Sequence, residues 1–96
     1  MRRDNTRPIS EVLSEYIEAF KLKGKLGEVA FLKAWPEVVG ENIARHTKDI
    51  KIQNKILYVK IQSSIIRQEI MMIRNELIKR LNEKAGETVV NEMILY

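Results

Sequence analysis

A short glycine-containing segment is the first place in this sequence where chemistry could be expected. Residues 24–27 read Gly-Lys-Leu-Gly, and the nearby Lys21, Lys23 and Lys25 add positive charge. Some nucleic-acid-binding domains clamp a sugar-phosphate backbone with a Gly-x-x-Gly loop between two helices. The same four residues also suit an ordinary helix-breaking turn, so their place among the helices and strands must decide between the two interpretations.

A second candidate lies in residues 49–62, where lysines alternate with apolar residues. We expect Lys51 and Lys60 to share the open face of a β-hairpin with Tyr58, because alternate side chains of a strand point to the same side. An exposed tyrosine can stack on a base while lysines displace counterions from phosphates, which gives salt-dependent, weakly sequence-selective binding. The alternative is that Tyr58 is a surface residue with an apolar body and a polar tip.

The candidate nucleic-acid contacts are basic apart from one tyrosine. They comprise Arg2, Arg3, Arg7, Lys21, Lys23, Lys25, Arg45, Lys48, Lys51, Lys55, Tyr58 and Lys60. Residues 1–8 are expected to form a flexible basic arm, and residues 9–96 a single domain. The net charge of +4 suits contact with a polyanion, although many proteins that bind no nucleic acid are as basic.

The sequence offers little for catalysis. Its single histidine, His46, has no metal-binding spacing such as His-Glu-x-x-His around it, and we interpret it as a hydrogen-bonded or solvated residue at a helix end. Neither of the common glycine-rich phosphate-binding motifs occurs, and there is no cysteine to act as nucleophile or metal ligand. We therefore expect a protein that is not an enzyme and needs no metal or cofactor.

The composition is that of one soluble domain. Of the 96 residues, 45% are apolar and 31% are charged. No apolar run approaches the roughly 18–20 residues of a membrane-spanning helix, and the charged start is not followed by the apolar core of a signal peptide. We expect a cytoplasmic protein.

Apolar periodicity predicts two helices in the first half of the chain. The first begins near Ser10 and ends at the glycines of residues 24–27, and the second carries Trp35 on its apolar face. Pro36 should kink this second helix or restart it. For Trp35 we favour a core anchor, with a partner-binding surface as the alternative. A short helical turn is expected before Thr47.

The second half of the chain changes period. A hairpin turning at residues 53–55 is predicted, with Asn54 left-handed, and then one unbroken helix over about 64–85 whose apolar seam comprises Ile66, Ile70, Ile73, Leu77 and Leu81. For Met71 and Met72 we favour core packing, with an adaptable binding surface as the alternative. Residues 88–96 should form a final strand. The order α-α-β-β-α-β predicts an α+β fold, a three-stranded sheet with helices packed on one face.

Residues 34–70 resemble the DciA family of bacterial replicative-helicase operators, long known as a domain of unknown function. The residues that carry the resemblance are Trp35, Gly40, Ile43, His46, Thr47, Leu57, Val59 and Ser63. The resemblance spans most of residues 9–95. This chain departs from the family in having Ile65 and Ile66 where members commonly carry an aromatic residue, and in showing only a short arm where many carry a long flexible extension.

Family membership would imply a KH-like fold, contact with the hexameric DnaB-type replicative helicase, and affinity for DNA. From the basic residues around the hairpin we expect this DNA to be single-stranded and bound without sequence specificity. The KH clamp lies between two helices that connect two strands, whereas residues 24–27 precede every predicted strand, so we interpret them as a helix-breaking turn. The leading hypothesis is a replication accessory protein that assists helicase loading. The alternatives are a small KH-like module in RNA or ribosome metabolism, and an interaction domain without nucleic-acid affinity.

Overall fold

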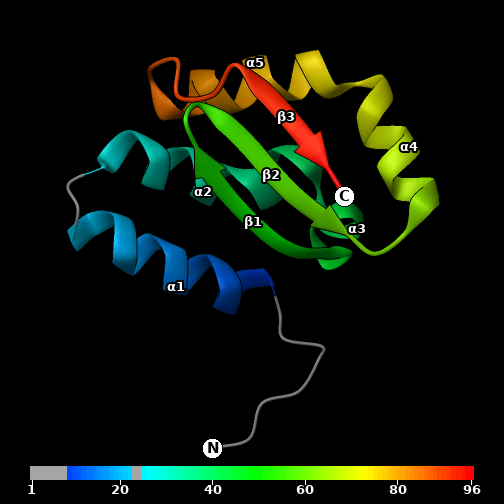
Figure 1. Cartoon of the computed structure of the whole chain (residues 1–96), viewed down its shortest axis with the longest axis horizontal. Coiled ribbons are helices and arrows are strands. Elements are labelled where there is room, and N and C mark those ends of the chain that lie inside the picture. Colours follow the sequence, from blue (N-terminus) through cyan, green and yellow to red (C-terminus); the bar gives the residue numbers. More distant parts are fainter. Residues whose placement is uncertain (1–8, 23–24) are drawn as a thin grey trace, which may run out of the picture.

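The computed structural model describes residues 9–22 and 25–96, which form an α+β fold (Figure 1). The first half comprises the helices α1 (Ile9–Leu22), α2 (Leu26–Val39) and α3 (Glu41–Arg45). The second half comprises β1 (Thr47–Gln53), β2 (Ile56–Ile61), α4 (Ser64–Met72), α5 (Arg74–Ala85) and β3 (Glu92–Leu95). The predicted fold class and order are confirmed, except that two helices take the place of one between β2 and β3.

The sheet is mixed, with strand order β1-β2-β3. β1 and β2 pair antiparallel, whereas β3 runs parallel to β2, from Ile56 opposite Glu92 to Val59 opposite Leu95. Parallel neighbours need a crossover connection, which α4 and α5 supply. The chain from β2 to β3 therefore has the strand-helix-helix-strand order of a KH unit.

The hairpin turn lies at Asn54 and Lys55. Both residues have positive φ angles, 52° and 62°. Two left-handed residues between paired strands match the right-handed twist of the hairpin, as in a type I′ turn. The expected conformation of Asn54 is confirmed, and Lys55 adopts it as well.

Helix α2 supplies the largest core side chains. Phe31, Leu32 and Trp35 are completely buried, and α2 contacts α1, α5 and β1. Burying side chains of this size stabilises the fold by about 1.5–3 kcal/mol each. The interpretation of Trp35 as a core anchor is confirmed. α2 continues through Pro36 and does not restart there.

The predicted unbroken helix over about 64–85 is wrong, because the helix ends at Met72 and a new one begins at Arg74. Ile73 has φ −115° and ψ 17°, and its amide bonds the carbonyl of Ile70 in a tightened last turn. α4 packs on β2, and α5 packs on α2. The bend between them lets the apolar residues of α4 face the sheet and those of α5 face α2. Ile73, expected in the seam, is consequently exposed.

The final strand is shorter than predicted, since residues 88–91 are irregular. The side chain of Asn82 takes up their backbone groups: its Oδ1 accepts from the amides of Val89 and Val90, and its Nδ2 donates to the carbonyl of Val90. Val89 and Val90 are buried. The segment thus closes over the end of α5 and leaves only Glu92–Leu95 to pair with β2.

Candidate nucleic-acid interface

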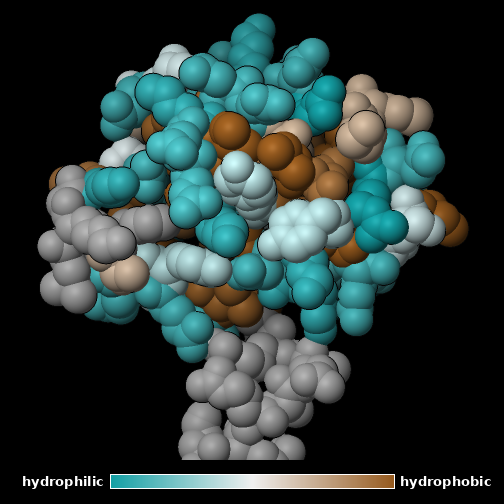
Figure 2. All heavy atoms as spheres, in the orientation of Figure 1, coloured by the Kyte–Doolittle hydropathy of each residue, from teal (hydrophilic) through white to brown (hydrophobic). Residues whose placement is uncertain are grey.

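Among residues 9–22 and 25–96, no helix lies across one face of the sheet. Figure 1 looks onto this face, with α2, α3 and α5 behind the strands. Alternation along the strands assigns nine outward positions to it: Asp49, Lys51, Gln53, Ile56, Tyr58, Lys60, Glu92, Ile94 and Tyr96. We call this set the open face. Brown and pale side chains gather in its middle, with teal ones around them (Figure 2).

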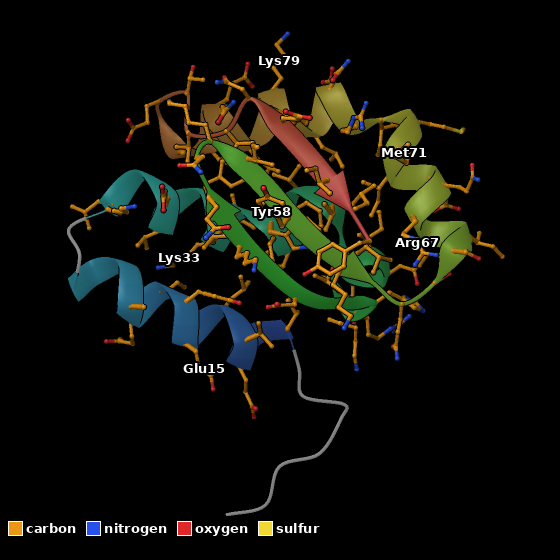
Figure 3. All side chains as sticks on the ribbon, in the orientation of Figure 1. Glu15, Lys33, Tyr58, Arg67, Met71 and Lys79 are labelled. Atoms are coloured by element: carbon orange, nitrogen blue, oxygen red, sulfur yellow. The ribbon has the colours of Figure 1, made fainter. Side chains whose placement is uncertain are left out.

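Tyr58 lies at the centre of the open face, on β2 (Figure 3). It pairs with Lys51 across β1 and β2, and the Nζ of Lys51 lies 5.9 Å from the centroid of the tyrosine ring. That distance is within the range of a cation–π contact. Lys60 follows Tyr58 on the same face and is exposed. The structure therefore brings together the three hairpin residues expected to share a face.

Tyr58 is half-buried among charged and apolar neighbours, and the ammonium of Lys51 lies over its ring. Ile94 lies opposite Tyr58 on β3. A base placed on the ring could therefore rest on an apolar neighbour on one side and have an ammonium group on the other. Such a combination can stack a base and hold its phosphate.

An acidic residue at one corner of the open face is tied to the adjacent helix. The hydroxyl of Tyr16 on α1 donates to Oδ1 of Asp49 at 2.8 Å, and the amide of Ile50 donates to the same oxygen at 3.0 Å. Burial raises the pKa of the Tyr16 phenol, and its hydrogen bond to Asp49 raises that pKa further. Asp49 is thus turned toward α1, and this contact fixes α1 beside β1.

The other basic candidates lie away from Tyr58. Arg45 is exposed on α3, where its guanidinium bonds Asn42, and Lys55 at the hairpin turn donates to the carbonyl of Thr88. Lys25 is exposed just before α2, and Lys48 is half-buried at the start of β1. Arg2, Arg3, Arg7 and Lys23 lie outside the described residues, as does the side chain of Lys21.

Sequence reasoning missed the contribution of the last strand. Ile94 and Tyr96 are exposed to 38% and 48%, and they join Ile56 on the open face. The alternation of Glu92, Ile94 and Tyr96 around buried Met93 was available as a signal. The parallel pairing that brings them next to β2 was not, because strand order does not follow from alternation.

The residues that carry the family resemblance are structural. The Nε1 of Trp35 donates to the hydroxyl of Thr47 at 3.1 Å, and that hydroxyl donates to the carbonyl of Ile43 at 2.9 Å. Gly40 separates α2 from α3 with φ 93° and ψ 167°, a conformation open to glycine alone. Together they fix the passage from α2 to β1.

The remaining family residues fix the passage from the hairpin to α4. Leu57 and Val59 are completely buried, and Ser63 caps α4 by accepting from the amide of Ile66. Nδ1 of His46 lies 2.9 Å from the carbonyl oxygen of Asn42, at the end of α3. His46 is therefore hydrogen-bonded at a helix end, one of the two environments expected for it.

Residues 24–27 precede β1 in the chain, so they do not connect two strands. Gly24 lies outside the described residues, and Gly27 is in the first turn of α2. A Cβ at Gly27 would meet the carboxylate of Glu87, the end of an exposed and flexible side chain in the segment after α5.

In a KH unit, the glycine loop lies between the two helices that connect the strands. In this chain that position is the bend between α4 and α5. Here it reads Met71-Met72-Ile73-Arg74, without glycine. Met71 and Met72 are exposed to 53% and 78%, so the expectation that they pack in the core is wrong and the alternative of an adaptable surface fits. Without a glycine, this bend lacks the close backbone approach that a Gly-x-x-Gly loop offers to phosphates.

Within residues 9–22 and 25–96, no helix is long and apolar enough to cross a membrane. Among the same residues, no three histidine, cysteine, aspartate or glutamate side chains are grouped so as to hold a metal ion.

Comparison with known proteins gives one family and two similar bacterial proteins. The family described as Dna[CI] antecedent, DciA, matches residues 8–95. A UPF0232 protein of Corynebacterium glutamicum is 27% identical over 62 residues, which cover 65% of this chain and 35% of that protein. A UPF0232 protein of Rhodococcus jostii is 28% identical over 69 residues, covering 72% and 37%. The chain thus spans about a third of the length of these relatives.

Proposed function

Because this chain belongs to the DciA family, we propose that it binds the DnaB-type replicative helicase and single-stranded DNA, and assists the loading of the helicase. The family is associated with the DnaB helicase and is not known as a catalytic family. The observation that carries the proposal is the extent of the match, residues 8–95, which includes every described element.

The open face supports the DNA part of the proposal. Lys51 and Lys60 flank Tyr58 on a surface that none of the described helices covers. Contacts of this kind recognise phosphates and base faces and carry little sequence information, as a loading factor requires. The glycine-free bend between α4 and α5 argues against the KH clamp, and with it against the alternative of a KH-type RNA-binding module.

The two activities would cooperate by proximity. A protein that is bound to the helicase and also holds a single strand keeps that strand near the ring at an effective concentration that can reach the millimolar range. Weak affinity for DNA would then suffice. Weak contacts also release the strand once the helicase has enclosed it, so the accessory protein would not oppose translocation.

The test is a mixture of the protein with the replicative helicase of the same organism, analysed by size-exclusion chromatography with light scattering. We expect a co-migrating complex, with nucleotide present or absent. A Lys51→Glu, Lys60→Glu variant should still form this complex but should stimulate loading on single-stranded DNA less than the unmodified protein does. If no complex forms under any of these conditions, including added DNA, the helicase proposal is wrong.

A further inference from the structure

We propose that the open face holds two consecutive nucleotides of a single-stranded nucleic acid, with one base on Tyr58 and the next on Tyr96. The inference rests on the nucleic-acid part of the proposed function and specifies its site. It assigns Tyr96 as a second stacking residue. It also predicts that the bound strand crosses the sheet diagonally.

The geometric basis is a lysine–tyrosine pair that occurs twice. Lys51 lies directly opposite Tyr58 in the β1–β2 pairing. Lys60 lies beside Tyr96 in the β2–β3 pairing, because the amide of Tyr96 bonds the carbonyl of Val59 at 3.0 Å and the carbonyl of Tyr96 accepts from Ile61 at 2.8 Å. In both pairs the lysine lies one strand before the tyrosine. The second pair is displaced from the first by one strand and one outward position.

The displacement arranges the open face in diagonal stripes. A basic stripe contains Lys51 and Lys60, and an apolar stripe contains Ile56 and Ile94. Between them runs the stripe of Gln53, Tyr58 and Tyr96, while the acidic Asp49 and Glu92 occupy the two corners outside the stripes. Phosphates over the basic stripe would place bases over the tyrosines and base edges over the isoleucines.

The spacing of the tyrosines selects an unstacked strand. Diagonal neighbours in a sheet are about 7–8 Å apart. Successive bases of B-DNA rise by about 3.4 Å. Two bases on the two tyrosines must therefore be separated from each other, which a flexible single strand permits and a base-paired duplex does not. The exposed carboxylate of Glu92 repels phosphates at one corner, which favours a strand that follows the diagonal.

The proposed site is testable because stacking and charge can be removed separately. Fluorescence anisotropy of a labelled ten-nucleotide thymidine strand would be measured with Tyr58→Leu, Tyr96→Leu and the matched Tyr58→Phe and Tyr96→Phe variants. Each leucine variant should weaken binding about tenfold, the typical effect of losing one stacked base. The phenylalanine variants keep the ring and should bind within about twofold of the unmodified protein. Far-UV circular dichroism would verify that each variant is folded.

Competition identifies the ligand. Unlabelled thymidine or uridine strands should displace the probe, the stronger competitor showing whether DNA or RNA is preferred, and a duplex of equal length should not. Equal competition by the duplex, or leucine variants that bind like the unmodified protein, would overturn the two-nucleotide site. If the two-nucleotide site fails this test but the helicase complex still forms, the helicase part of the proposed function stands. If the leucine variants weaken binding as expected but no helicase complex forms, only the helicase part is wrong.

Discussion

The indole of Trp35 and the hydroxyl of Thr47 form a buried hydrogen bond between the central helix and the first residue of the sheet. The Nε1–Oγ1 distance is 3.1 Å, and the exposed fractions of the two residues are 0% and 3%. The same hydroxyl donates to the part-buried carbonyl of Ile43, which also accepts from the amide of His46, so one oxygen joins α2 to the end of α3. This explains why a tryptophan and a threonine twelve positions apart belong to one sequence motif.

Thr47→Val keeps the shape of the side chain and removes both hydrogen bonds. Because the buried indole N–H loses its partner, while the Ile43 carbonyl keeps its bond from the His46 amide, we expect the free energy of unfolding to fall by about 1–3 kcal/mol. Urea denaturation followed by far-UV circular dichroism measures this. Thr88→Val, at an exposed threonine, is the control and should change stability by less than about 0.5 kcal/mol. Equal effects of the two substitutions would contradict the assigned role of Thr47.

Gly40 and Gly27 differ in backbone conformation, so their substitution by alanine should affect stability differently. Gly40 has φ 93° and ψ 167° with no atom near its missing Cβ, so Gly40→Ala should be destabilising by about 1–3 kcal/mol through backbone strain alone. Gly27 is helical, and the group it would meet is the end of the exposed Glu87 side chain, which can rotate away. Gly27→Ala should be neutral or stabilising by up to about 1 kcal/mol.

Thermal unfolding of the two alanine variants distinguishes these effects. For a domain of this size, 1 kcal/mol corresponds to about 4–8 °C in Tm. A fall in Tm for Gly27→Ala as large as that for Gly40→Ala would mean that the Glu87 side chain cannot rotate away from the new methyl group. The close approach at Gly27 would then be a rigid contact of the fold.

Most of the fold could be predicted because local pattern and tertiary structure agree. The alternation from Ile50 to Val59 specified the hairpin, and Asn54 specified its turn. The bend at Ile73 has no such signal, because a β-branched residue without glycine or proline nearby does not indicate a helix end. It arises from packing of α4 and α5 against different elements, which only the tertiary structure contains.

The same limit applies to the candidate site. Lys51, Tyr58 and Lys60 could be placed together because they belong to one hairpin, whose register follows from its turn. Tyr96 could not, because its position beside Lys60 depends on the parallel return of β3 after two helices. Contacts between neighbouring elements can be predicted from sequence, and contacts made by a crossover cannot.

Tyr16→Phe should destabilise the protein in a pH-dependent way. At pH 7 the loss of the hydrogen bond to Asp49 should lower the free energy of unfolding by about 1 kcal/mol. The pKa of Tyr16 is raised in the folded state, first by burial and then by Asp49. Its contribution is therefore complete below the unfolded pKa of about 10 and declines above it, where the unfolded chain alone ionises.

Urea denaturation of both proteins from pH 7 to pH 11 measures this decline. The difference between them should be constant to about pH 10 and then shrink, because the unmodified protein loses a stabilising term that the variant lacks. Other lysines and tyrosines titrate in the same range, but they cancel in the difference. A difference that stays constant to pH 11 would contradict the raised pKa.

Charge reversal on the basic stripe should weaken binding of single strands. Lys51→Glu with Lys60→Glu removes two phosphate contacts, so we expect at least a tenfold lower affinity at low salt. The negative slope of log K against log salt concentration should become less steep by about 1.4, because each of the two lost phosphate contacts accounts for about 0.7. Fluorescence anisotropy over a series of salt concentrations gives both quantities.

The matched control for this pair reverses two lysines elsewhere. Lys33 on α2 and Lys79 on α5 are exposed and lie away from Tyr58 (Figure 3). Lys33→Glu with Lys79→Glu changes the net charge equally, so any effect of overall charge appears in both variants. An equal loss of affinity and of slope in the control would mean that DNA is attracted by net charge and has no site on the open face.

Neutralising one cation at the bend and one on the open face distinguishes the two modes of binding. If the bend between α4 and α5 held the phosphate backbone, Arg74 would be its nearest cation, half-buried beside Met71. Arg74→Gln and Lys51→Gln remove the same charge, one at the bend and one beside Tyr58. Because exposed apolar side chains occupy the bend, we expect Arg74→Gln to alter affinity for single-stranded DNA by less than twofold. Lys51→Gln should weaken it several-fold in the same anisotropy titration, and the reverse order would return the site to the KH clamp position.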